Sequence, residues 1–439
     1  MSKTLKTTLG FYSPSFMHLH VGGSFEPSKI GVIHDDYSES IYLHEYTHFI
    51  QDISTTYGYT NINIFADYMR MANNKVTASS PGGFKVPVDP VPGAADNVYA
   101  GLKLHELYNG SGDALAITIK NYKETMKPVV LDVGSRNFPV IELTYSIPGS
   151  RKLKTFEFGA LCVMESMAFL LERACYPASP TSPDLPYRSA EKLAQLLHPA
   201  FAKNPLNILA LCDVALRDFH PGSFFFDTLY LLKRNKMVPG SPEEVYDFAN
   251  KHHKPFKFGT ASNLDELFSF SGNQAINQLG KYFYDPQFDP IKNWLENIIR
   301  KSMEYRFKNP TFTIDIARSG PIAGNKPLAD FMNAAGTPLI TNDLNQLYLF
   351  DPNSYTTEPN YPLIWAVDQI MEVLLADQKN CDLIGYCKSV RAPTDTRCHH
   401  SPWDRANDPP PWCPFAIMWR HWAMAGHYPI DEQNSNSVL

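Results

Sequence analysis

Three residues of the N-terminal region have types and spacing suited to metal chemistry. His44 and His48 are four positions apart, and Glu45 directly follows the first histidine. On an α-helix, residues i and i+4 lie on the same face, roughly 6 Å apart along the axis, so both imidazoles can converge on one metal ion. Glu45 is rotated by about 100° from His44 and can reach a water molecule beside the metal. The spacing therefore predicts a metal site with His44 and His48 as ligands and Glu45 as general base.

The sequence around these residues favours an unbroken helix. No proline or glycine falls between Ser38 and Thr56, and the pattern predicts Ser38 as the N-cap and Gly58 as the C-terminal stop. Apolar and aromatic residues recur at helical spacing and predict the buried face: Tyr42, Tyr46, Phe49, Ile50 and Ile53. The alternative is a core helix whose histidines are only hydrogen-bonded.

The segment HEYTHFI, residues 44–50, resembles the zinc-binding helix of the zincin metallopeptidases. The match includes the uncharged residues inside the motif and the hydrophobic residues after it. The resemblance is confined to this helix. It implies zinc as the metal, His44 and His48 as its ligands, Glu45 as the base that activates water, and peptide-bond hydrolysis as the reaction.

A catalytic zinc usually has a third protein ligand. The metzincin continuation of the motif is absent, because Gln51 and Ser54 stand at the positions of its glycine and third histidine. That leaves a glutamate from a second helix, the gluzincin arrangement. Glu165 is the only charged residue of the apolar stretch 158–171, where an unpaired carboxylate would cost several kcal/mol. Glu165 is therefore the predicted third ligand and Glu172 the reserve, with an ion pair to a buried Arg or Lys as the alternative.

Composition limits the classes of protein. The 439 residues are 44% hydrophobic and 13% aromatic, which is typical of a globular chain, and the net charge of −6 gives no reason to expect nucleic-acid binding. The first residues lack the apolar core of a signal peptide, and no apolar run is long enough to span a membrane. The seven cysteines then predict reduced thiols in a cytoplasmic protein. The resemblance to zincins implies a peptide or protein as substrate.

The expected fold class is α+β, mainly α. A zincin-like core, with a small sheet, the motif helix and a second ligand-bearing helix, is implied by the resemblance for residues 1–175. Residues 176–308 are predicted to be mainly helical and residues 309–439 to be a loop-rich extension. Periodicity predicts a strand at 29–34, a β-meander at 129–133, 140–147 and 152–158, and helices at 189–202, 205–218, 224–234, 242–253 and 361–378.

Other candidate residues lie outside the motif. Cys381, Cys387, Cys398 and Cys413 could bind a second, structural zinc, or they could be ordinary buried thiols. His220 is a possible donor to the oxyanion, although the sequence does not place it. The histidines at 18, 20 and 34 are expected to be hydrogen-bonded or exposed.

The sequence thus predicts a zinc-dependent metallopeptidase. Two alternatives stay open: a zinc-dependent hydrolase of a non-peptide amide or ester, and a non-enzymatic pseudo-protease scaffold. The scaffold would be favoured if Glu45 turned away from the metal or if no third ligand lay within reach.

Overall fold

The computed structural model describes residues 10–15, 17–30, 34–90, 98–131, 134–178, 182–252, 263–352, 360–375 and 380–431. Over these residues the chain is mainly helical and carries three small β-sheets, so the expected mixed and mainly helical class is confirmed at this level. The helices are α1 (Asp36–Ser54), α2 (Thr56–Thr77), α3 (Val98–Asn109), α4 (Ala160–Cys175), α5 (Ser189–Leu197), α6 (Pro205–Ala215), α7 (Pro221–Arg234), α8 (Pro242–His252), α9 (Leu264–Tyr282), α10 (Asp289–Lys308), α11 (Phe312–Ser319), α12 (Lys326–Ala335), α13 (Pro362–Leu374), α14 (Ile384–Ser389) and α15 (Pro414–His421). The strands are β1 (Gly10–Ser13), β2 (His18–Val21), β3 (Gly83–Val86), β4 (Thr118–Leu131), β5 (Gly134–Ser146), β6 (Leu153–Phe158), β7 (Leu339–Asn342), β8 (Leu347–Tyr348) and β9 (Tyr428–Asp431).

The sheet beside α1 joins the two ends of the chain. Its strand order is β1-β2-β7-β8, and β2 pairs in parallel with β7, some 320 residues further along. Alternate residues of a strand point to opposite faces. The Phe11–His20 and Ser13–His18 pairs therefore share one face, while Gly10 and Tyr12 face the other way. A Cβ at Gly10 would meet Ile41 and Glu45 of α1, so α1 covers the face of Gly10.

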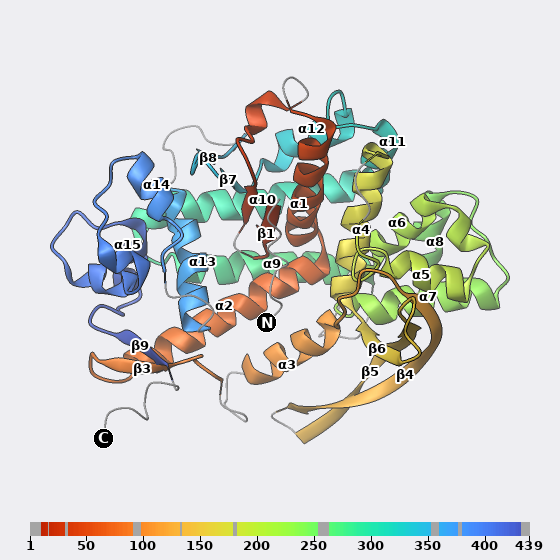
Figure 1. Cartoon of the computed structure of the whole chain (residues 1–439), viewed down its shortest axis with the longest axis horizontal. Coiled ribbons are helices and arrows are strands. Elements are labelled where there is room, and N and C mark those ends of the chain that lie inside the picture. The colour runs from red at the N-terminus through yellow and green to blue at the C-terminus, as the bar shows by residue number, and fades with distance from the viewer. Residues whose placement is uncertain are drawn as a thin grey trace.

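The predicted β-meander is present as a second sheet of order β4-β5-β6. Strand β4 starts eleven residues before the predicted 129, because its early residues pair with β5 although their side chains show little apolar pattern. Residues 132 and 133 of the prediction lie outside the described residues. Figure 1 shows the β4–β5 hairpin as a long curved ribbon that projects from the helical body.

The boundaries of the motif helix differ from the prediction. Asp35, not Ser38, caps α1, and its side chain accepts a hydrogen bond from the backbone N–H of Ser38. Helix α1 ends at Ser54 because Thr55 is extended, and Gly58 lies inside α2 rather than ending α1. A Cβ at Gly58 would come within 2.4 Å of the Gln51 carbonyl oxygen, so this glycine serves the close approach of the two helices.

The strand predicted at 29–34 is wrong at both described ends. Lys29 closes a 3₁₀ turn that starts at Pro27, and Ile30 forms a turn hydrogen bond back to Pro27. His34 bonds through its ring to the backbone of Glu26, which folds the segment back on itself. Residues 31–33 lie outside the described residues.

Helix α1 is at the centre of the hydrophobic core. Its predicted apolar face is buried, and α1 packs against α2, α4 and α10. In Figure 1, α1 and α4 stand side by side, and α9 and α10 cross behind them. The three predicted regions share this core, since α4, α10 and β7 come from different ones. None of the described helices has the length and apolarity needed to cross a membrane.

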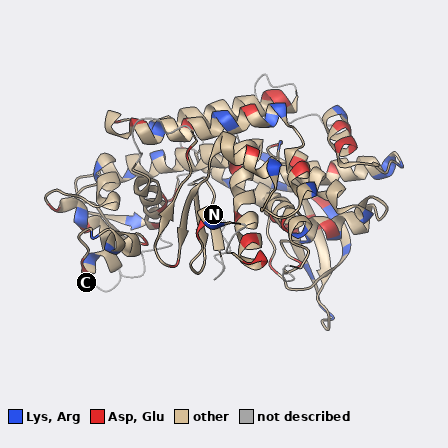
Figure 2. Ribbon diagram, turned by 90° about the horizontal axis from the view of Figure 1, so that it is seen from above, with Lys and Arg blue, Asp and Glu red and all other residues tan. Residues whose placement is uncertain are grey.

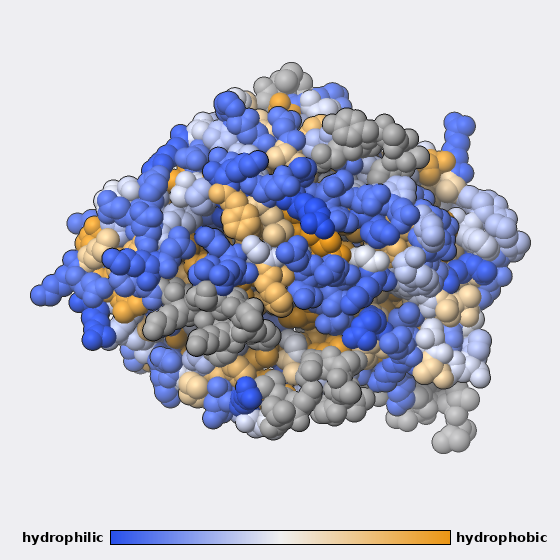
Figure 3. All heavy atoms as spheres, turned by 180° about the vertical axis from the view of Figure 1, so that it is seen from behind, coloured by the Kyte–Doolittle hydropathy of each residue, from blue (hydrophilic) through white to orange (hydrophobic). Residues whose placement is uncertain are grey.

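Charge and hydropathy are distributed as in a protein that buries its apolar side chains. Lys and Arg are interspersed with Asp and Glu along the described elements, without a face reserved for one sign (Figure 2). Hydrophilic side chains cover most of the face seen in Figure 3, with hydrophobic ones visible between them near its centre.

A buried ion pair links the C-terminal end of α1 to several other helices. Asp213 of α6 is fully buried and accepts two hydrogen bonds from Arg306 of α10, at 2.9 and 3.0 Å. Arg306 also donates to Ser54 Oγ, at the last residue of α1 (3.1 Å), and Asp213 accepts from Tyr246 and Thr313. The pair therefore holds the C-terminal end of α1 against α6, α8, α10 and α11.

Replacing Arg306 by leucine should lower the free energy of unfolding by about 3–5 kcal/mol, because it leaves the Asp213 carboxylate buried without its cation. Denaturant unfolding followed by circular dichroism measures this change. The matched control is Arg318→Leu, which breaks a half-exposed pair with Glu243 and should cost less than about 1 kcal/mol. Equal losses for the two variants would contradict a structural role for the buried pair.

Candidate metal centre

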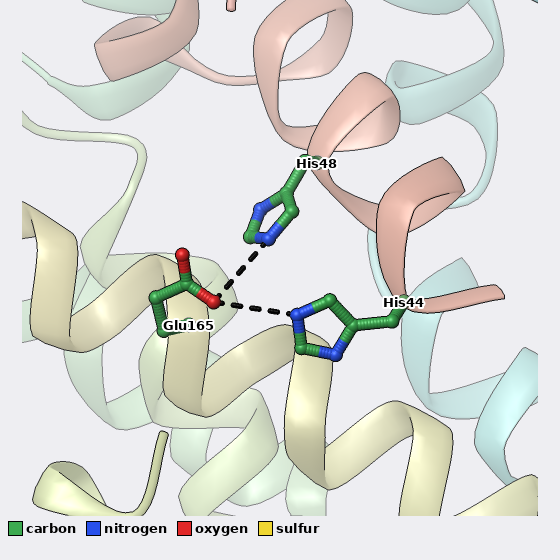
Figure 4. Close-up of side chains that lie close together, drawn as sticks. All are labelled: His44, His48 and Glu165. Carbon is green, nitrogen blue, oxygen red and sulfur yellow. Dashed lines mark hydrogen bonds and ion pairs between the residues drawn. The ribbon is translucent and has the colours of Figure 1, made fainter. Parts of the chain in front are cut away.

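The metal ligands predicted from the sequence lie on two packed helices. His44 and His48 project from the same face of α1, and Glu165 projects from the middle of α4. Figure 4 shows both imidazoles pointing from α1 to one oxygen of the Glu165 carboxylate. At the other end of α4, its N-cap Gly159 permits a close approach to α3, because a Cβ there would lie 2.5 Å from the carbonyl oxygens of Tyr108 and Asn109.

Two of the three distances between the ligand atoms match those around a tetrahedral metal, and all three atoms lie within 4.8 Å of one another. Glu165 Oε2 lies 3.3 Å from His44 Nε2 and 3.4 Å from His48 Nε2. Ligand atoms at 2.0–2.1 Å from a tetrahedral zinc lie roughly 3.3 Å from one another. Among the described residues, this is the one group of three such side chains whose ligand atoms all lie within 4.8 Å. The residues therefore fit zinc, and Glu165 is within reach as third ligand.

Hydrogen bonds at the Nδ1 atoms fix the tautomers of His44 and His48. His44 Nδ1 lies 3.0 Å from Glu172 Oε2, and His48 Nδ1 lies 2.8 Å from Gln51 Oε1. Both partners accept, since the amide nitrogen of Gln51 donates to the Met164 carbonyl. Each Nδ1 therefore carries a proton, and each neutral imidazole keeps its lone pair on Nε2, facing Glu165. Three acceptors then face one another, which calls for a cation among them.

Glu172, the predicted reserve ligand, is not part of the group of three ligand atoms formed by His44, His48 and Glu165. It lies on the same face of α4 as Glu165, but its carboxylate contacts the Nδ1 side of His44 rather than the Nε2 side. A carboxylate that accepts from a ligating histidine orients the ring and raises its basicity. Glu172 therefore lies on the Nδ1 side of the His44 ring, and Glu165 lies on the Nε2 side within the candidate ligand group. Among the described residues, the charged partners of Glu165 are His44 and His48 rather than a buried Arg or Lys.

The charges of the centre shift its pKa values in opposite directions. Burial alone would raise the pKa of Glu165, but the charges and hydrogen bonds of His48 and His44 outweigh it and lower the pKa. Burial likewise opposes protonation of His44, yet its contacts with Glu165 and Glu172 raise its pKa. Without a metal, the centre would hold protons on the histidines instead.

Glu45 lies beside the ligands and next to strand β1. A Cβ at Gly10 would lie 3.4 Å from Glu45 Cγ, so the strand passes directly over this side chain. Burial raises the pKa of Glu45, and the charges of Glu165 and Glu172 add to this, while the two histidines oppose it. A carboxylate with a raised pKa is a better proton acceptor near neutral pH.

Tyr187 also lies beside His44, although the sequence pattern does not indicate it. Its ring centroid lies 5.6 Å from that of His44, and the side chain is partly exposed. Burial and the charges of Glu165, Glu45 and Glu172 raise its pKa, which keeps its hydroxyl protonated. The loop before α5 places it, because Asp184 accepts from the Ile117 N–H and Leu185 donates to the Ala114 carbonyl. A tyrosine in a proline-containing loop gives no sequence signal, since only the fold brings it to α1.

His220 and the cysteines have other surroundings. His220 stacks on Tyr108 at 4.1 Å and contacts Ser223, and burial lowers its pKa to about 4. These contacts give no link to the metal centre. Cys381, Cys387, Cys398 and Cys413 are free thiols near one another, and the backbone N–H of Cys381 donates to the carbonyl of Cys398. Their sulfur atoms do not form a group of three within 4.8 Å, so a second zinc stays a prediction.

Comparisons of the chain with protein-family models, curated proteins and solved structures find no match. The metal centre therefore rests on its own geometry and chemistry.

Metal content tests the ligand set directly. Protein purified with zinc should contain one zinc ion at this centre by mass spectrometry, and His44→Ala or Glu165→Ala should lose it because each removes one of three ligands. Glu172→Gln should keep zinc but weaken its binding about 10- to 100-fold, as expected for an orienting residue.

The control is Cys413→Ala. If it loses a second zinc while keeping the first, the cysteines hold a structural ion. Wild type that binds zinc no better than His44→Ala would overturn the metal centre and leave α1 as a packed helix.

Proposed function

We propose that the protein is a zinc-dependent metallopeptidase with a zincin-like core and a glutamate as third ligand, as in gluzincins. One observation carries the proposal: Nε2 of His44 and Nε2 of His48 lie 3.3 and 3.4 Å from one oxygen of Glu165, and Glu45 directly follows His44 on the same helix. Three protein ligands and an adjacent carboxylate are the composition of a hydrolytic zinc site rather than a structural one.

The chain's own residues would divide the work as follows. Zinc held by His44, His48 and Glu165 would polarise the substrate carbonyl and lower the pKa of a water molecule. Glu45 accepts the proton as water attacks the carbonyl carbon and then delivers it to the leaving amine. Tyr187 donates its hydroxyl proton in a hydrogen bond to the carbonyl oxygen as negative charge develops there. Glu172 and Gln51 keep the two imidazoles oriented throughout.

The choice of a peptide as substrate rests on the resemblance of HEYTHFI to zincins. Hydrolysis of a non-peptide amide or ester would use the same groups, so assays must include both substrate classes. A pseudo-protease scaffold is less well supported, because the third ligand lies within reach and Glu45 lies beside the ligands.

Replacing Glu45 by glutamine should lower kcat by about 100- to 10,000-fold while zinc content stays unchanged, because the amide cannot accept the proton. A fluorogenic peptide library, assayed beside small amides and esters, measures the loss. Glu304→Gln, on an exposed part of α10, is the matched control and should leave the rate unchanged. Zinc-loaded wild type that hydrolyses none of these substrates would speak for the scaffold.

Tyr187→Phe should lower kcat on the order of 100-fold with little change in KM, because the hydroxyl acts on charge that develops in the transition state. Steady-state kinetics on the best substrate, with zinc content determined in parallel, measure this split. Tyr230→Phe removes an exposed hydroxyl and serves as control. A change confined to KM would assign Tyr187 to substrate binding instead.

A further inference from the structure

A second group of buried polar side chains lies on the other face of the β1–β2–β7–β8 sheet. A pocket of about 240 Å³, partly open to solvent, lies there between the sheet and α13. His18, His20 and Thr341 line it from the strands, Trp365 and Asp368 from α13, and Asp382 from the segment that follows. The proposed hydrolysis uses none of these residues.

A chain of hydrogen bonds fixes the tautomer of His18. His20 Nε2 lies 3.2 Å from Asp343 Oδ1, so it carries the ring proton and Nδ1 of a neutral His20 accepts. Thr341 Oγ1 lies 3.1 Å from that Nδ1 and donates its one proton there. The same oxygen lies 2.9 Å from His18 Nε2 and therefore accepts from it. Nδ1 of a neutral His18 is left with a lone pair.

That lone pair faces another acceptor. His18 is 2% exposed, and its Nδ1 has no hydrogen-bond partner among the described residues. Asp368 Oδ2 lies 3.7 Å away, and the other oxygen of this carboxylate accepts from Ser13 Oγ at 3.0 Å. Buried polar atoms without a partner are costly and therefore rare. Among the described residues, no N–H donor lies between His18 Nδ1 and Asp368 Oδ2.

The walls of the pocket suit a positive charge. Asp368 and Asp382 contribute two carboxylates, and the described residues that line the pocket include no Lys or Arg. The Trp365 ring lies 4.8 Å from that of His18, and aromatic faces attract organic cations. Within the part of the chain that the structure describes, no three carboxylate or imidazole side chains here bring their ligand atoms within 4.8 Å of one another, which disfavours a metal ion.

We propose that this pocket binds the cationic group of an amine or guanidinium, whose N–H groups bridge His18 Nδ1 and Asp368 Oδ2. Such a group supplies the missing donor, neutralises the carboxylates and packs against Trp365. A free small amine and a basic side chain of a peptide share this chemistry. The site is independent of the proposed hydrolysis, although Phe11, which also lines it, directly follows the Gly10 that passes over Glu45.

Calorimetric titration of the full chain with agmatine, and with an acetylated and amidated Gly-Arg-Gly peptide, tests the site. Wild type should bind agmatine, and Asp368→Asn should weaken binding at least about tenfold. Asp330→Asn removes an exposed carboxylate elsewhere and should leave affinity unchanged. His44→Ala should bind agmatine as wild type does, which separates this site from the metal centre and from any failure of the hydrolase.

The two ligands distinguish the sources of the cation. Binding of agmatine alone supports a free amine, and binding of both supports a side chain. His18→Gln supplies its own N–H donor to Asp368 and should also weaken binding while thermal unfolding confirms the fold. If wild type binds neither ligand, or if Asp368→Asn binds as well as Asp330→Asn, the proposal is overturned and a proton on His18 is the donor.

Discussion

Two imidazole nitrogens and a carboxylate oxygen face one another in the buried space between α1 and α4, and they require a positive charge among them. Glu172 and Gln51 already occupy the Nδ1 protons, so each Nε2 presents either a lone pair or a second proton to Glu165. In a buried space, three such acceptors without a positive charge among them would cost several kcal/mol. One divalent cation can bind all three acceptors while both histidines stay neutral. Protons can satisfy all three acceptors only if both imidazole rings become cationic.

This balance depends on two helices being held at a fixed separation. Arg306 ties the end of α1 to Asp213, and Gly58 allows α2 to fold back closely against α1. On the side of α1 that faces β1, Asp52 accepts hydrogen bonds from Tyr12 and from the backbone of Ser15, and burial raises the pKa of Asp52 to about 7. These contacts hold α1 from several sides. A set of metal ligands tolerates only small displacements of either helix, so the contacts help to keep the spacing of the three ligand atoms.

The parts of the centre that depend on local spacing could be predicted from the sequence. The interval between His44 and His48 fixes their common face, and a lone carboxylate in an apolar helix identifies Glu165. The role of Glu172 could not be predicted, since a shared helix face does not say which ring nitrogen it meets. Tyr187 and the β2–β7 pairing depend on contacts between distant segments. In the sequence Gly58 looks like the end of a helix. Glycine is needed there because a Cβ would collide with a backbone oxygen of α1.

Strand β1 connects the metal centre with the pocket around His18. Its alternate residues face opposite sides, so Gly10 and Tyr12 meet α1 while Phe11 and Ser13 meet the pocket. A Cβ at position 10 would lie 2.9 Å from Ile41 and 3.0 Å from the His20 carbonyl oxygen, so the strand can lie this close to α1 only with glycine there. Strand β1 is therefore a common wall: its Gly10 lies against Glu45 on one face, and its Ser13 hydroxyl donates to Asp368 on the other.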